Sequence, residues 1–145
     1  MISPGSNGKI LFGGIIMAKL TTEMKDFIGQ LKLCAVATAD KSGMPNVSFK
    51  GSISVLDDET LVFADIFSAK TRKNLQENNQ ICIYVADHKK MIGFQFKGKA
   101  ELLDSGELYD TVCAAVEGMK MNLPKPVYVV KTKVEEIYPA PAARE

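Results

Sequence analysis

The 145-residue chain contains no tryptophan, one histidine and three cysteines. The histidine, His88, lies in a turn-like Asp-His-Lys-Lys segment and cannot anchor a zinc site with these cysteines. No Ser-His-Asp or Cys-His catalytic group can be assembled around it. The cysteines, Cys34, Cys82 and Cys113, are odd in number and widely spaced, which argues against a disulfide framework. A reducing, cytoplasmic setting is the expectation that fits best.

The chain also lacks a strong charge of either sign. It has 18 Lys and Arg against 17 Asp and Glu, a formal net charge of +1. A nucleic-acid-binding protein usually carries a broad basic surplus, so we expect no nucleic-acid partner. The apolar run at 10–17 is too short to span a bilayer, so we expect no membrane association. The length fits one domain with a substantial core.

Apolar and polar residues alternate most strictly between positions 46 and 55, which is typical of a strand with one face of each kind. Similar signals predict six strands, at 33–39, 47–55, 60–66, 80–86, 91–103 and 127–138. Helices are predicted at 22–31, 69–78 and 107–121. Because most strands are joined by short turns, we expect a mainly β fold in which an antiparallel sheet closes into a barrel.

The sequence also predicts the limits of the domain. Residues 1–16 are treated as a flexible leader that is not necessarily native, because Met17 is a candidate first residue. Residues 17–138 form the single domain. The Pro- and Ala-rich segment at 139–145 is expected to be a disordered tail.

Three cations crowd the expected start of the helix at 69–78: Lys70, Arg72 and Lys73. A helix N-terminus carries partial positive charge and unpaired N–H groups, so cations are unfavourable there unless an anion binds. The hydroxyls of Ser68 and Thr71 add donors suited to a phosphate. A basic, solvated helix face is the alternative, and the residues alone leave both open.

Three segments carry a resemblance to a known family. They read Ala-Thr-Ala-Asp-Lys-Ser-Gly-Met-Pro-Asn-Val at 37–47, Ser-Ala-Lys-Thr-Arg-Lys-Asn-Leu at 68–75 and Gly-Phe-Gln-Phe-Lys-Gly-Lys-Ala at 93–100. In this order they resemble the FMN-binding split-barrel family, which includes pyridoxamine 5′-phosphate oxidase. The resemblance covers about residues 20 to 138.

The resemblance implies a six-stranded split β-barrel and a homodimer that binds FMN at the subunit interface. It implies that Lys70 and Thr71 grip the FMN phosphate, with Ser68 and either Arg72 or Lys73 as helpers. The strand residues Ser48, Phe49 and Lys50 would run along the flavin ring. The loop before the helix, Asp65, Ile66 and Phe67, would complete the cofactor site. No metal and no catalytic acid or base is implied.

The chain departs from true pyridoxamine phosphate oxidases, which are longer and carry an Arg-containing C-terminal motif. The expectation is therefore a small FMN-binding oxidoreductase or electron carrier rather than an enzyme of vitamin B6 oxidation. A nicotinamide cofactor or a redox partner would be its second reactant. The alternative is a non-catalytic module for another phosphorylated cofactor, such as the deazaflavin F420. An OB-like barrel for single-stranded nucleic acid ranks lowest, because it would need exposed aromatics among cations.

Overall fold

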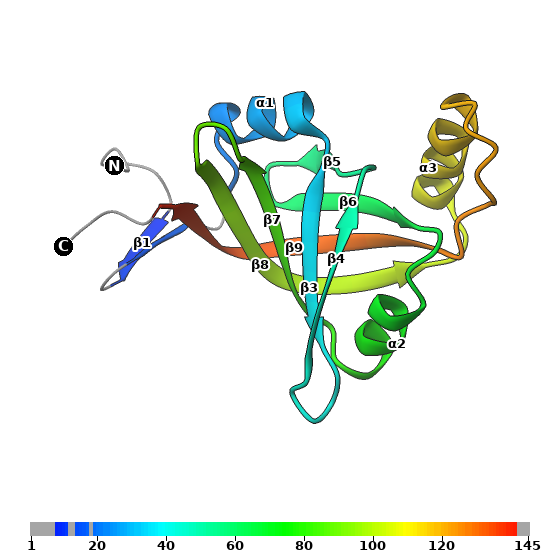
Figure 1. The fold of residues 1–145 in the computed structure, drawn as a ribbon, viewed down its shortest axis with the longest axis horizontal. Helices are drawn as coiled ribbons and strands as arrows, with labels where there is room; N and C mark the ends of the chain where they lie inside the picture. Colours follow the sequence, from blue (N-terminus) through cyan, green and yellow to red (C-terminus); the bar gives the residue numbers. More distant parts are fainter. Residues whose placement is uncertain (1–7, 12–13, 18, 142–145) are drawn as a thin grey trace.

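The computed structural model describes residues 8–11, 14–17 and 19–141. Its main body is a seven-stranded antiparallel sheet in the order β4-β3-β7-β8-β9-β6-β5 (Figure 1). The strands are β3 (Cys34–Ala39), β4 (Pro45–Lys50), β5 (Ser54–Asp57), β6 (Thr60–Asp65), β7 (Gln80–Asp87), β8 (Ile92–Leu103) and β9 (Tyr128–Ala140). The helices are α1 (Thr22–Leu31), α2 (Ala69–Glu77) and α3 (Glu107–Gly118).

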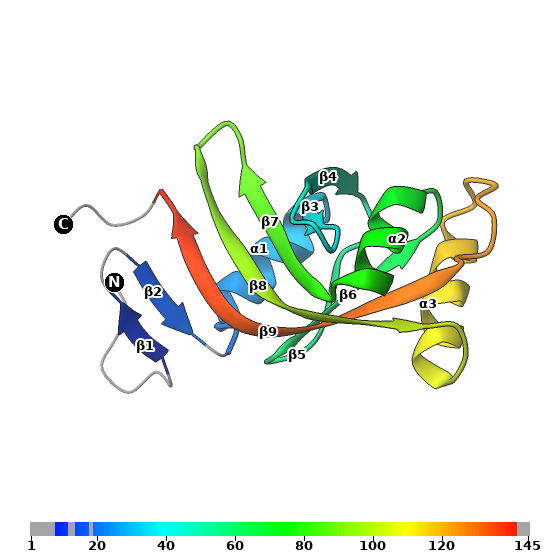
Figure 2. The ribbon, with the colours of Figure 1, turned by 90° about the horizontal axis from the view of Figure 1, so that it is seen from below.

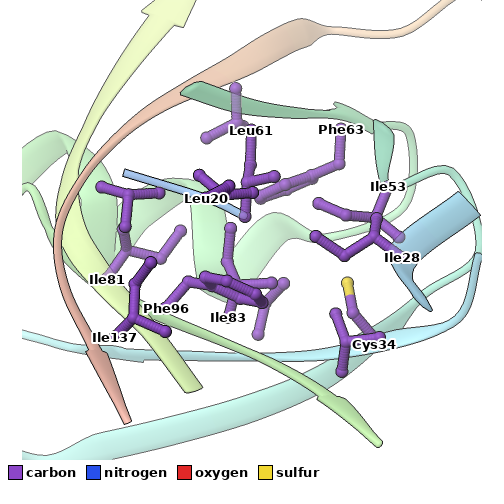
Figure 3. Close-up of a cluster of buried hydrophobic side chains, with 14 of the residues drawn as sticks. Leu20, Ile28, Cys34, Ile53, Leu61, Phe63, Ile81, Ile83, Phe96 and Ile137 are labelled. Atoms are coloured by element: carbon purple, nitrogen blue, oxygen red, sulfur yellow. The ribbon is translucent and has the colours of Figure 1, made fainter. Parts of the chain in front are cut away.

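The sheet curls around the main hydrophobic core, and a smaller buried cluster of Val62, Tyr109 and Val129 lies between α3 and the sheet. Side chains from strands far apart in the sheet order, such as Val36 on β3 and Phe63 on β6, belong to the same main cluster. Ile28 of α1 packs into this cluster and is fully buried (Figure 3). Cys34 is also in the core, where burial raises the pKa of its thiol to about 12. The fold is therefore the predicted antiparallel split barrel, open between its edge strands β4 and β5.

The predicted number of strands was wrong, because the segment at 47–55 is not one strand. β4 ends at Lys50 and β5 begins at Ser54, and these two strands form opposite edges of the sheet. At the bend between them, Ile53 turns into the core and the Ser52 hydroxyl accepts a hydrogen bond of 3.1 Å from the Ala64 N–H. The alternation of polar and apolar residues continues through the bend, so the pattern did not reveal it.

Strand β4 exposes its apolar face and turns its polar face toward the protein, the reverse of the usual arrangement. Its apolar side chains Val47 and Phe49 are 68% and 75% exposed, whereas Ser48 and Lys50 on the polar face are half-buried. The polar face lies toward α2, as hydrogen bonds between the two elements show. The edge strand thus presents its apolar face outward and its polar face to the protein.

A register shift between Lys97 and Gly98 interrupts the long pairing of β8 with β9. The two backbones approach so closely there that a Cβ at position 98 would collide with the carbonyl oxygen of Lys133. Only glycine fits this position without a backbone shift.

Both ends of the chain differ in detail from the expected boundaries. Within the expected leader, β1 (Gly8–Leu11) and β2 (Gly14–Met17) pair as an antiparallel hairpin, and residues 1–7 and 12–13 lie outside the described part. β9 extends to Ala140, and residues 142–145 of the expected tail also lie outside it. The hairpin lies at the opposite end of the molecule from α2 and α3 (Figure 2). No helix among the described residues is long and apolar enough to cross a membrane.

Candidate functional site

The start of α2 is held by a buried carboxylate at the end of β6. Asp65 is 2% exposed, and its Oδ1 accepts a hydrogen bond of 3.2 Å from the Ser68 N–H. Arg72 donates to both carboxylate oxygens, from Nε at 2.6 Å and from Nη2 at 3.2 Å. This hydrogen-bonded pairing raises the pKa of the Arg72 guanidinium above its ordinary value. Of the three crowded cations, Arg72 therefore already has an anionic partner inside the protein.

Thr71 joins α2 to the polar face of β4. Its side chain is buried, and its Oγ1 lies 3.2 Å from the Ser48 hydroxyl and 3.4 Å from the Asn46 amide nitrogen that donates to it. Ser68 precedes the helix and makes no capping hydrogen bond with its side chain. The first N–H groups of a helix have no intrahelical acceptor, so this end of α2 suits an anion.

A cavity of about 620 Å³ lies between β4, the start of α2 and the segment that follows α3. Its volume falls in the range of small-molecule and cofactor sites, about 300–1,000 Å³. In both ribbon views α2 and α3 lie at the same end of the barrel (Figures 1 and 2). The lining residues are 46–52 of β4 and the bend, Ala64, 66–71, Val116, Met119, Met121 and Leu123.

The structure brings together eight of the nine residues predicted to bind a cofactor. Those that line the cavity are Ser48, Phe49, Lys50, Ile66, Phe67, Ser68, Lys70 and Thr71. The ninth, Asp65, is not among the lining residues, because its carboxylate is used by Ser68 and Arg72. Asp65 therefore acts on the site through the position of the loop and the helix.

Two cations face the cavity, and no Asp or Glu is among its lining residues in the described part of the chain. Lys70 is exposed at the start of α2. Lys50 is half-buried, and burial lowers its pKa below the ordinary value, with the nearby Asp65 charge acting in the opposite direction. Lys73, by contrast, is exposed and does not line the cavity. The cavity is thus electrostatically suited to a ligand with a negative group.

Sequence reasoning missed the side of the cavity that the segment after α3 forms. The helix predicted at 107–121 ends at Gly118, and the next residues turn back toward the cavity. Lys120 and Asn122 both have φ of 54°, a left-handed conformation that ends helical geometry. Gly118 and the downstream Pro124 were the signals of a helix end, but the apolar spacing continued past them.

The comparisons with known proteins identify the family. The model described as pyridoxamine 5′-phosphate oxidase matches residues 20–139. The chain belongs to this family. An uncharacterized protein of Methanocaldococcus jannaschii is 38% identical over 132 residues, which cover 90% of this chain and 86% of that protein.

Solved structures share the same fold. HupZ of Group A Streptococcus is 32% identical with a TM-score of 0.76, covering 83% of this chain and 94% of HupZ. An FMN-binding protein of Syntrophomonas wolfei is 20% identical with a TM-score of 0.73, covering 83% and 86%. The heme storage protein HutZ of Vibrio cholerae is 22% identical with a TM-score of 0.62, covering 83% and 94%. Proteins that share this fold are thus described by different ligands.

Proposed function

We propose that this member of the family is a flavoprotein that binds FMN in the cavity between β4 and α2. The observation that carries the proposal is the position of Lys70, which lines the cavity at the open start of α2 and is in none of the ion pairs formed among the described residues. No Asp or Glu is among the described lining residues of the same cavity. A phosphate there would accept hydrogen bonds from Lys70, Thr71 and the first N–H groups of α2. The 5′-phosphate of FMN needs several hydrogen-bond donors, and these groups would supply them.

We assign the rest of the cavity to the remainder of FMN. Ser48, Phe49 and Lys50 would lie along the flavin ring, and Ile66 and Phe67 would flank it from the loop before α2. When bound, FMN supplies hydride or single-electron transfer, so the protein would act as an oxidoreductase or an electron carrier. Of the side chains that ligate heme iron, the described lining residues include Met119 and Met121 but no His, Cys or Tyr. Because Met ligates heme iron together with a His, this lining favours FMN over heme.

We also propose that the protein is a homodimer through the outer face of the sheet. Val47 and Phe49 are exposed on an edge strand, where large apolar side chains invite association. Phe49 lies in register with Ala35, which in turn is in register with Tyr84 on β7. Tyr84 is 37% exposed, so the apolar surface continues across three strands. In a sedimentation experiment we expect the wild type to be a dimer and Phe49→Glu to be a monomer.

The FMN site is tested by comparing Lys70→Ala with Lys73→Ala. Both lysines are exposed on α2, but only Lys70 lines the cavity. A hydrogen bond to a charged group contributes about 1.5–3 kcal/mol, so Lys70→Ala should weaken FMN binding roughly 10- to 100-fold. Because riboflavin has no phosphate, its affinity should stay within about twofold. Lys73→Ala should leave both affinities unchanged, as measured by quenching of flavin fluorescence.

Clear outcomes would contradict the proposal. If the purified protein holds no flavin and does not bind added FMN, the FMN assignment is wrong. Binding of F420 without FMN would instead favour a module for that phosphorylated cofactor. Equal loss of FMN and riboflavin in Lys70→Ala would show that Lys70 does not bind the phosphate.

A further inference from the structure

Part of the cavity lining is apolar. It includes Val116 from α3 and Met119, Met121 and Leu123 from the following segment. We call these last three residues the methionine wall. Met119 is 46% exposed and Met121 is 66% exposed, although Met side chains in a folded protein are usually buried. Exposed apolar side chains that line a cavity commonly mark a ligand-binding surface.

The segment that carries the methionine wall is held by contacts outside the cavity. The Tyr109 hydroxyl on α3 donates a hydrogen bond of 2.8 Å to the carbonyl oxygen of Pro126. The Val127 N–H donates a hydrogen bond of 2.8 Å to the carbonyl oxygen of Asp65. Two anchors therefore fix the end of the segment, one to α3 and one to the end of β6. The methionine wall thus belongs to a segment whose far end, beyond Leu123, is fixed to the rest of the protein.

The chemistry of the wall differs from that of the proposed phosphate site. The two lysines that line the cavity come from β4 and α2, whereas the wall contributes only thioether and aliphatic side chains. Methionine sulfur makes favourable contacts with aromatic rings, and its flexible side chain adapts to rings of different shape. A charged group would lose hydration against this wall without gaining a partner.

We propose that Met119, Met121 and Leu123 form a subsite for a flat, uncharged aromatic ring belonging to a second ligand. This inference rests on the proposed FMN site, because the second ligand would bind beside FMN in the same cavity. The protein would thus accept a molecule whose interacting part is aromatic and uncharged. The wall would thereby select the second ligand, while α2 selects the cofactor.

The test uses 1-naphthol as the neutral probe and 1-naphthyl phosphate as its charged counterpart, titrated calorimetrically into FMN-loaded protein. The wild type should prefer 1-naphthol. The double variant Met119→Ala/Met121→Ala should bind 1-naphthol about tenfold more weakly, as expected for the loss of two sulfur–aromatic contacts. Its FMN affinity should not change. Met44→Ala is the matched control, because Met44 is 62% exposed and does not line the cavity.

Four results would overturn the inference. The first is an unchanged affinity of the double variant for 1-naphthol, and the second is a wild-type preference for 1-naphthyl phosphate. The third is a parallel loss of FMN and riboflavin binding in the double variant, which would assign the wall to the flavin ring. The fourth is a monomeric double variant from a dimeric wild type, which would assign the wall to the subunit interface. If the wild type does not bind FMN, the proposed function fails, and titration of 1-naphthol into the apoprotein still tests the wall.

Discussion

Replacing Arg72 with methionine would remove the partner of a carboxylate that is almost wholly buried. The Asp65 side chain is 2% exposed, whereas the Arg72 side chain retains 23% of its exposed surface. Removing one member of a buried ion pair costs about 3–5 kcal/mol, because the other charge stays buried without compensation. We expect Arg72→Met to lower the free energy of unfolding by about 3 kcal/mol, at the lower end because one partner is partly exposed.

The reciprocal change should cost less. Asp65→Asn keeps an oxygen that can accept the Ser68 N–H and leaves Arg72 without its carboxylate. Because Arg72 reaches water, its unpaired charge can be solvated, and the loss should be about 1–2 kcal/mol. We therefore expect different losses from the two variants. Arg72→Met, which leaves the buried Asp65 unpaired, should be less stable than Asp65→Asn, which leaves the partly exposed Arg72 unpaired.

Urea unfolding followed by far-ultraviolet circular dichroism measures both losses, since the chain has no tryptophan to serve as a fluorescent probe. With a urea dependence of about 1–3 kcal/mol per molar, a loss of 3 kcal/mol moves the midpoint by about 1–3 M. Protein concentration must be equal for all variants, because association would add to the apparent stability. A loss below about 1 kcal/mol for Arg72→Met would mean that the pair behaves as a surface ion pair, and the reasoning would be wrong.

Three further predictions concern Lys50, Gly98 and Gly29. Burial lowers the pKa of Lys50 below 10.5, so the unfolded chain holds this proton to higher pH than the folded protein. The stability of the wild type relative to Lys50→Met should therefore rise as pH approaches 10.5, and a flat difference in urea titrations would contradict this. Gly98→Ala should cost about 2 kcal/mol or more, because its Cβ would collide with the Lys133 carbonyl. Gly29→Ala, in helix α1 with open space around it, should instead stabilise the protein by about 0.5–1 kcal/mol in the same unfolding experiment.

The strands and helices around the cavity could be predicted because their signals are local. Helix α2 begins after a buried strand and a serine, and observed bounds of 69–77 differ from the predicted 69–78 by one residue. The grouping of residues 48–50 with 66–71 came from the resemblance to the family, since spacing along the chain does not show which segments meet. The structure supplies that proximity through the contacts of Thr71 with β4.

Other features depend on tertiary contacts that no local pattern encodes. The bend after Lys50 keeps the polar–apolar alternation of a continuous strand, so only the closure of the barrel divides β4 from β5. The methionine wall follows the same principle. Met119 lies three residues after Val116, a spacing that predicts a continuing helix. The contact that holds the following segment joins residues far apart in the sequence, Tyr109 and Pro126. The sequence showed three crowded cations, but not that one of them is paired with Asp65.

Asp65 links two parts of the cavity lining. Its carboxylate holds the start of α2 through Ser68 and Arg72, and its backbone carbonyl accepts from the Val127 N–H, at the end of the segment that carries the methionine wall. A shift of Asp65 would therefore move the proposed phosphate site and the proposed aromatic subsite together. Asp65→Asn preserves the backbone bond to Val127, so it should weaken FMN binding more than 1-naphthol binding. If both affinities fall by the same factor, the carboxylate and the backbone of Asp65 do not act separately, and the two parts of the cavity lining behave as one unit.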